Sequence, residues 1–351
     1  MLEQHIEKGL ISVIMPTYNR TPVYLKQSIE SILCQTYSNF EFIIIDDGSD
    51  NASKEVIGSY DDPRIRLLVN EHNIGLPRSL NRGLDACRGE YIARMDDDDI
   101  AYPTRFEKQI AFMRANPDVI VCGTWVEFMD ENGKLTGITM RDCIEDMDSY
   151  RIALLFGNIP TIFHPSSFIN RRLFLENHLH YEPAYDYAED YRLWIRCSTI
   201  GKCDILREVL MKYRRHSGSV SIVKKQAQKD VDFAIMQLQL DNLHLTLSDE
   251  VKPLHYHLMN DNWNLHNRYD PKLKKWIKEL IKANRRYRVY NQKKLKSLLW
   301  YRWSLICRLA MKNETNIIKK ASIILSLTPR GYLFWMKRAV IKLVEKLFVR
   351  K

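Results

Sequence analysis

The chain has 351 residues and a formal net charge of +10, and 45% of its residues are apolar while 27% are charged. At roughly 100–200 residues per domain the length predicts two domains, and the composition excludes disordered and collagen-like chains. No apolar run reaches the roughly 18 residues of a membrane-spanning helix, and the N-terminal residues lack the pattern of a secretory signal, so we expect neither feature.

Strand and helix patterns alternate through the first third of the chain. Strands are predicted where β-branched and aromatic residues cluster, at 11–15, 40–45, 64–70, 91–95 and 119–128. Helices are predicted where apolar residues recur at spacings of three and four, at 23–35, 77–87 and 103–116. This alternation predicts an α/β fold with a mostly parallel sheet and helices on both faces, in which ligands bind beyond the carboxyl ends of the strands.

Four adjacent aspartates, Asp96 to Asp99, follow the strand predicted at 91–95. Adjacent carboxylates repel one another, and at least one would have a raised pKa without a compensating cation. Mg²⁺ and Mn²⁺ prefer carboxylate oxygens and often keep ligand phosphates in their coordination shell. The cluster therefore favours a divalent-metal site, with a solvated acidic turn as the alternative.

Two other acidic pairs have both a functional and a structural interpretation. Asp47 follows the strand predicted at 40–45, where it could accept a hydrogen bond from a nucleobase or ribose, or form a turn that caps the next helix. Glu189 and Asp190 precede a helical apolar face, where acids also serve as simple caps. Neither a dinucleotide-binding glycine motif nor a P-loop motif occurs in the sequence.

Histidines and cysteines give weaker signals. His164 lies in a loop next to proline, and His216 follows two arginines near the end of the α/β region. A lone histidine is more often structural than functional, so both matter only if other polar groups converge on them. The seven cysteines include no C-x-x-C pair, which disfavours a disulfide framework or a zinc site and favours a reducing cytosol.

Six segments occur in a characteristic order: ISVIMPTYNR, FIIIDDGSD, NIGLPRSLN, GEYIARMDDDDI, AEDYRLWIR and YRRHSGSVS. Together they resemble the successive signatures of family-2 glycosyltransferases with the GT-A fold, in the variant found in bacterial enzymes that build O-antigen, capsule or exopolysaccharide. The resemblance covers about residues 10–221. It implies a catalytic domain over residues 1–221, a nucleotide-sugar donor, most readily a UDP-sugar, and a glycan acceptor.

The resemblance also implies roles on the nucleotide side of the site. Tyr18 would pack against the nucleobase, with the Pro16 backbone nearby, and Asp47 would hydrogen-bond the base or ribose. Arg78 would lie near the nucleotide, where the family often has a basic residue.

The D-x-D element of the family falls on Asp96, Asp97 and Asp98. Asp98 would be the main metal ligand, while Asp96 and Asp97 would face the sugar nucleotide. The additional Asp99 leaves the register of this element open by one residue. The implied cofactor is Mn²⁺ or Mg²⁺.

The late motifs supply the implied catalytic group. Asp190 matches the general base that removes the proton of the acceptor hydroxyl, and His216 matches a histidine that approaches the metal or the diphosphate. Glu189 and His164 would line the site or contact the acceptor. One base and no second nucleophilic carboxylate imply an inverting, metal-dependent hexosyl or glycosyl transfer.

Basic residues concentrate at the C-terminus. Residues 271–351 hold 23 Lys and Arg against 3 Asp and Glu, whereas residues 1–270 hold 30 against 40. The segments 293–312 and 332–350 have the pattern of basic amphipathic helices with tryptophan, typical of helices in a membrane interface. We therefore predict that residues 222–351 form a helical region that binds the anionic inner face of the cell membrane, where a cytoplasmic enzyme would meet a lipid-linked acceptor.

Alternatives remain for the C-terminal region and for the function of the whole chain. The C-terminal region could be a helical subdomain that packs its tryptophans internally. The whole chain could be a nucleotide- or glycan-binding scaffold without turnover, which the joint presence of Asp98 and Asp190 disfavours. It could also bind nucleic acid through the basic tail, which the acidic N-terminal region disfavours. The sequence indicates no oligomeric state.

Overall fold

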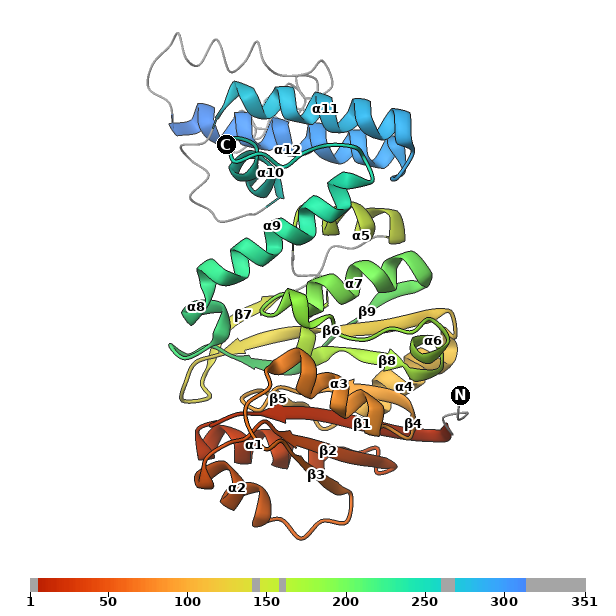
Figure 1. Ribbon diagram of the computed structural model, residues 1–351, viewed down its shortest axis with the longest axis vertical. Coiled ribbons are helices and arrows are strands. Elements are labelled where there is room, and N and C mark those ends of the chain that lie inside the picture. The colour runs from red at the N-terminus through yellow and green to blue at the C-terminus, as the bar shows by residue number, and fades with distance from the viewer. Residues whose placement is uncertain (1–5, 141–145, 158–161, 260–268, 314–351) are drawn as a thin grey trace, which may run out of the picture. The chain divides into compact units, whose positions relative to one another are not determined.

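A computed structural model describes residues 6–140, 146–157, 162–259 and 269–313 (Figure 1). The chain divides into two compact units. The first comprises Met1–Tyr150 and Pro160–Asp232, and the second comprises Arg151–Ile159 and Phe233–Lys351. The division lies after Asp232, whereas the sequence predicted a boundary after residue 221, and a short internal segment belongs to the C-terminal unit.

The first unit contains a nine-stranded sheet. Its strands are β1 Glu7–Thr17, β2 Phe40–Asp46, β3 Ile65–Val69, β4 Gly89–Arg94, β5 Ile100–Ala101, β6 Val119–Met129, β7 Leu135–Met140, β8 Phe168–Asn170 and β9 Lys202–Arg214. Their order is β3-β2-β1-β4-β8-β6-β9-β5, with β7 paired to β6. Strands β1 to β4 run parallel, as do β6 and β9, whereas the pairs that involve β5, β7 and β8 are antiparallel. The sheet is therefore mixed, and each of the five predicted strands makes a parallel pair in it.

Helices cover both faces of this sheet (Figure 1). The helices of the first unit are α1 Pro22–Leu33, α2 Asn51–Gly58, α3 Leu76–Ala86, α4 Arg105–Ala115, α6 Arg171–Glu176, α7 Glu189–Ile200 and α8 Val220–Val223, with short 3-10 turns at η1 His164–Ser166 and η2 Pro183–Tyr185. Alternation along β1 explains the two layers, since Val13 packs in the core that includes α1 while Ile14 faces α3. A Cβ on Gly83 of α3 would lie 2.9 Å from Ile45 Cδ1, so a larger residue there would require the Ile45 side chain to shift.

The second unit is helical. Helices α5 Met147–Leu154 and α9 Lys225–Asp241 contain the points of division, and α10 Lys252–Met259, α11 Pro271–Tyr287 and α12 Gln292–Asn313 follow. Trp276 and Trp303 are buried in its core. Trp276 of α11 and Trp303 of α12 thus pack internally, as the alternative interpretation of this region expected, while the segment 332–350 lies outside the described residues. No helix in the described part of the chain combines the length and hydropathy needed to cross a bilayer.

A buried histidine makes the stability of the second unit depend on pH. His255 accepts a hydrogen bond at Nδ1 from Trp276 Nε1 (3.1 Å) and donates one from Nε2 to the Leu155 carbonyl (2.8 Å). Burial lowers the pKa of His255 to about 4. An unfolded chain protonates this group near pH 6.5, so its contribution to stability is complete above that pH and is lost as the pH falls toward 4.

We therefore expect His255→Gln to reduce the dependence of the unfolding free energy on pH in this range. Between about pH 7 and about pH 5 the wild type should lose about 2 kcal/mol more of its unfolding free energy than the variant, a difference that urea unfolding followed by tryptophan fluorescence measures. Equal losses in the two proteins would show that His255 does not titrate as its burial requires.

Candidate active site

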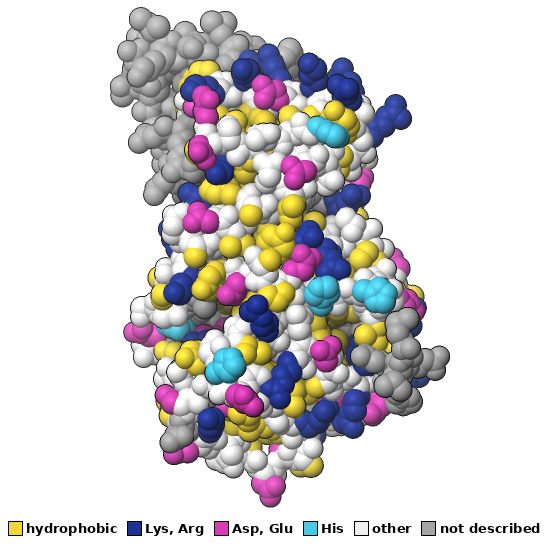
Figure 2. All heavy atoms as spheres, in the orientation of Figure 1, with side chains coloured by type: hydrophobic (Ala, Val, Ile, Leu, Met, Phe, Trp, Pro, Cys, Tyr) yellow, Lys and Arg dark blue, Asp and Glu magenta, His cyan; other side chains and the backbone are white. Residues whose placement is uncertain are grey.

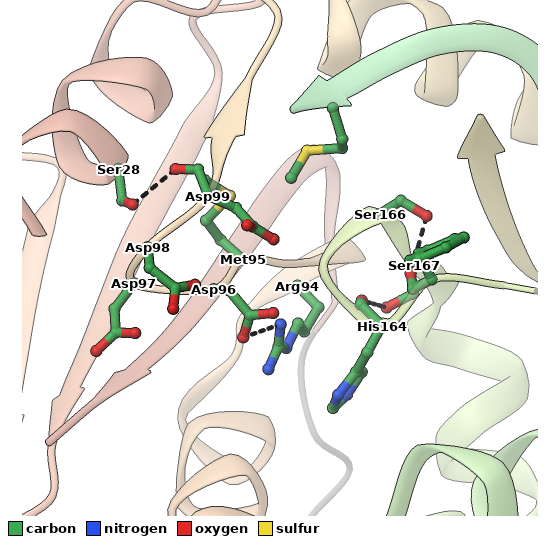
Figure 3. Close-up of polar contacts among 12 residues, drawn as sticks. Ser28, Arg94, Met95, Asp96, Asp97, Asp98, Asp99, His164, Ser166 and Ser167 are labelled. Carbon is green, nitrogen blue, oxygen red and sulfur yellow. Dashed lines mark hydrogen bonds and ion pairs between the residues drawn. The ribbon is translucent and has the colours of Figure 1, made fainter. Parts of the chain in front are cut away.

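The four aspartates lie where β4 ends and the chain turns into β5 (Figure 3). One carboxylate oxygen from each of Asp96, Asp98 and Asp99 lies within 4.8 Å of the other two. Burial raises the pKa of Asp96 and of Asp99, and the charge of Asp98 raises both further. Burial also raises the pKa of Asp97, to about 6. The cluster therefore favours a bound cation.

Basic side chains contact three of these carboxylates. Arg20 donates a hydrogen bond from Nε to Asp97 Oδ1 (2.7 Å), and its Nη1 forms an ion pair with Asp98 Oδ2 (3.1 Å). His216 donates from Nε2 to the same Asp98 oxygen (3.0 Å), and Arg94 forms an ion pair with Asp96. Burial tends to raise the pKa of Asp98, but the His216 hydrogen bond and the Arg20 charge hold it below its usual value. The structure thus brings His216 to the acid that the sequence analysis named as the main metal ligand.

Asp99 connects the cluster to the fold. Its Oδ1 accepts a hydrogen bond from the Arg214 backbone (2.8 Å), and its carbonyl accepts one from Ser28 Oγ (2.7 Å). Its second carboxylate oxygen is buried and has no hydrogen-bond partner among the described residues. An unpartnered buried oxygen beside two further carboxylates fits a hard divalent cation, which takes oxygen ligands. The residues present therefore suit the metal that the resemblance implies.

The residues expected on the nucleotide side lie at the ends of neighbouring strands. Pro16 pairs in register with Ile45 near the ends of β1 and β2, and Tyr18 follows with 49% of its surface exposed. Arg78 is exposed on the first turn of α3, where its Nη1 donates to the Ile74 carbonyl (3.3 Å). Parallel strands bring these positions to one edge of the sheet.

Asp47 makes a set of hydrogen bonds within the protein. Its Oδ1 accepts from Asn70 Nδ2 (2.6 Å) and the Ile74 backbone (2.9 Å), and its Oδ2 accepts from the Gly75 backbone (3.0 Å). Asp47 thereby fixes the loop that leads into α3. Its predicted contact with a base or ribose stays a prediction.

Glu189 and His164 form a buried pair. Glu189 Oε1 lies 3.8 Å from His164 Nδ1, and His164 Nε2 lies 2.8 Å from the Tyr181 hydroxyl. Burial, with the charge of Asp190, raises the pKa of Glu189 to about 8. Burial, with the charge of Arg94, lowers the pKa of His164 well below its usual value. Both groups are therefore uncharged at neutral pH. Figure 3 shows Arg94 between Asp96 and His164 in this view.

Asp190 differs from its neighbour because it is only half-buried at the start of α7. Asp232 of α9 lies within electrostatic range of it, since burial and the Asp190 charge raise the pKa of Asp232 to about 7. One Asp232 oxygen is buried without a hydrogen-bond partner in the described structure. The sequence analysis missed Asp232, which lies in a helix with no motif around it.

Comparisons with known proteins identify the family of the chain. Residues 12–179 match the family model for Glycosyl transferase family 2. The chain is 38% identical to an uncharacterized glycosyltransferase of Methanocaldococcus jannaschii, over 63% of this chain and 77% of that protein. It is 32% identical to the amylovoran biosynthesis glycosyltransferase AmsE of Erwinia amylovora, over 68% of this chain and 86% of that protein.

Solved structures share the fold. The crystal structure of S. aureus TarS 1–349 superposes with a TM-score of 0.54 at 19% identity, covering 87% of this chain and 90% of that one. The same protein in complex with UDP-GlcNAc gives a TM-score of 0.55 at 17% identity, covering 86% and 88%. The likeness confirms the expected GT-A-type α/β fold with a helical C-terminal region.

Proposed function

This chain belongs to glycosyltransferase family 2, and we propose that it is an inverting enzyme that transfers a sugar from a nucleotide-sugar donor to an acceptor hydroxyl during cell-surface polysaccharide synthesis. The carboxylate cluster of Asp96, Asp98 and Asp99 at the end of β4 carries this proposal. The similarity to AmsE, which is named for amylovoran biosynthesis, supports the polysaccharide class of product. A UDP-sugar is the first donor to test, because TarS, which shares the fold, forms a complex with UDP-GlcNAc.

Asp96, Asp98 and Asp99 would hold Mn²⁺ or Mg²⁺, with His216 beside Asp98. Bound there, the metal would supply Lewis-acid stabilisation of the negative charge that develops on the departing nucleoside diphosphate. Arg94 fixes the orientation of Asp96 through their ion pair. Arg214 holds the backbone of this turn, since its Nε donates to the Asp98 carbonyl (2.7 Å).

Asp190 would remove the proton from the acceptor hydroxyl as the new C–O bond forms. The bond between the sugar and the diphosphate breaks in the same step, so one displacement inverts the anomeric centre. An α-linked donor would then give a β-linked product. The half-exposure of Asp190, beside a fully buried Glu189, supports this choice of base because only the accessible carboxylate can meet an acceptor.

A donor screen tests the proposed function. Purified protein is incubated with Mn²⁺ and a panel of UDP-, GDP- and dTDP-sugars, and release of the nucleoside diphosphate is measured. Release from one class of donor is expected. If the protein binds a nucleotide sugar but releases no diphosphate with any acceptor tried, the non-catalytic scaffold is the better description.

We also propose that the enzyme is peripheral on the inner face of the cell membrane, with a lipid-linked acceptor. Helix α11 turns Leu273, Trp276 and Leu280 into the core of the second unit. Its exposed side carries Lys272, Lys275, Lys278, Lys282, Arg285 and Arg286. Figure 2 shows Lys and Arg side chains along the edge of the molecule where Figure 1 draws α11. Near an anionic leaflet each basic residue can add about 1 kcal/mol of attraction, which salt screens.

Charge reversal on α11 tests this membrane contact. The combined variant Lys275→Glu, Lys278→Glu and Lys282→Glu should lower binding to phosphatidylserine vesicles at low salt by tenfold or more. Transfer to a soluble acceptor should survive. Vesicle flotation measures the effect, and removal of residues 330–351 measures the contribution of the C-terminal segment in the same assay.

The matched control reverses three exposed lysines of the first unit, Lys26, Lys54 and Lys225. It should float like the wild type. Unchanged flotation of both the α11 variant and the truncated protein would contradict the membrane proposal. Preferential binding of a single-stranded RNA probe over vesicles would favour the nucleic-acid alternative.

A further inference from the structure

Arg20 occupies an unexpected position beside the acidic cluster. It follows the end of β1, and its side chain is 23% exposed. Two nitrogens of its guanidinium group contact these acids: Nε lies 2.7 Å from Asp97 Oδ1, and Nη1 lies 3.1 Å from Asp98 Oδ2. Burial acts against the charge of Arg20, but the aspartates outweigh it and raise the pKa of Arg20. Arg20 is therefore a fixed cation on two of the four acids.

This arrangement conflicts with metal binding at the same carboxylate. Asp98 Oδ2 already accepts a hydrogen bond from His216 and forms an ion pair with Arg20. Both groups lie within 3.1 Å of this oxygen, so a metal ion that uses the same oxygen must displace one of them. Like charges also repel, so a guanidinium this close weakens the site for a divalent cation.

Arg20 is the donor that can leave. Its long side chain is partly exposed, whereas the His216 ring is more buried and packs against Tyr24 with ring centroids 5.4 Å apart. A released guanidinium needs another anionic partner. The diphosphate of a sugar nucleotide is such a partner, because paired N–H groups of arginine match adjacent phosphate oxygens.

We propose that Arg20 exchanges partners during donor binding. In the free enzyme it neutralises Asp97 and Asp98, and in the donor complex it contacts the diphosphate while a divalent cation takes its place on the carboxylates. This inference rests on the proposed function. It predicts that the metal alone binds weakly and that metal and donor strengthen each other, because the donor removes the competing cation.

Direct binding measurements on Arg20→Ala test this exchange. Mn²⁺ binding is followed by the electron paramagnetic resonance of free Mn²⁺, and UDP binding by calorimetry at saturating Mn²⁺. Without its competitor, the variant should bind Mn²⁺ alone about tenfold more tightly than the wild type. It should bind UDP about tenfold more weakly, because it has lost charge-assisted hydrogen bonds to the diphosphate. Arg20→Lys, which keeps the charge, should lie between the two proteins.

The opposite signs of these two effects separate exchange from a structural role. If Arg20 only braces the aspartates, its loss should weaken Mn²⁺ binding, and either that result or an unchanged affinity overturns the inference. Arg78→Ala is the matched control, since Arg78 lies on the nucleotide side and contacts the Ile74 carbonyl, so only UDP binding should change. A wild type that binds neither Mn²⁺ nor UDP would overturn the proposed function and this inference with it. Urea unfolding of each variant verifies that the fold is intact.

Discussion

Asp98→Asn should lower sugar transfer by on the order of 10³-fold while the protein stays folded. Asp98 lies at the centre of the cluster, with an oxygen within 4.8 Å of those of Asp96 and Asp99 and a hydrogen bond from His216. Asparagine keeps the shape of the side chain but removes the charge that a hard cation requires. Transfer rates with the donor found in the screen, Mn²⁺ affinity and the midpoint of urea unfolding give the three measurements.

Asp97→Asn is the control for this substitution. It removes the same charge one residue earlier, yet Asp97 is not among the three acids whose oxygens converge. Its loss of activity should be at least tenfold smaller than that of Asp98→Asn. Equal losses would mean that total charge, not the position of Asp98, matters. Full wild-type activity in excess EDTA would contradict the metal assignment altogether.

The central strands were predictable from the sequence because they are buried on both faces. Strand β2 consists of buried residues from Phe40 to Asp46, and such runs of β-branched and aromatic residues have few other interpretations. Strand β9 was missed although it is longer. Its segment Lys202–Arg214 mixes charged and apolar residues, and its pairing with β6 shifts register near Trp125. The shift breaks the period of two on which sequence patterns depend.

The candidate site was also predictable only in part from the sequence. Residues that are adjacent in sequence, such as Asp96 to Asp99, were predictable as a group. Their partners Arg20 and His216 lie 77 and 118 positions away in the sequence from the aspartates that they contact. No role was predicted for Arg20, although it is the last residue of the motif ISVIMPTYNR. From the sequence alone, the four carboxylates have no visible cationic partner. The structure shows cationic partners on three of them, so charge repulsion alone is weak evidence for a metal, and the convergence of the oxygens is stronger.

The second large effect is expected for Asp190→Asn, which should keep donor binding and lose transfer by about 10²- to 10⁴-fold, the usual contribution of a general base. Asp190 is the half-buried member of the acidic pair that begins α7. A neutral amide in its place cannot accept the proton of the acceptor hydroxyl, but it leaves the nucleotide side of the site untouched. Calorimetry with the donor and a product assay measure the two steps separately.

Glu189→Gln provides a matched control one residue away. Burial and the charge of Asp190 raise the pKa of Glu189 to about 8, so this carboxyl group is already protonated at neutral pH and resembles glutamine in charge. Its replacement should change transfer by less than about tenfold at pH 7, because no charge is lost there. A wild-type rate in Asp190→Asn would remove Asp190 from the mechanism. A large loss in Glu189→Gln, with little loss in Asp190→Asn, would instead assign the role of base to the buried residue.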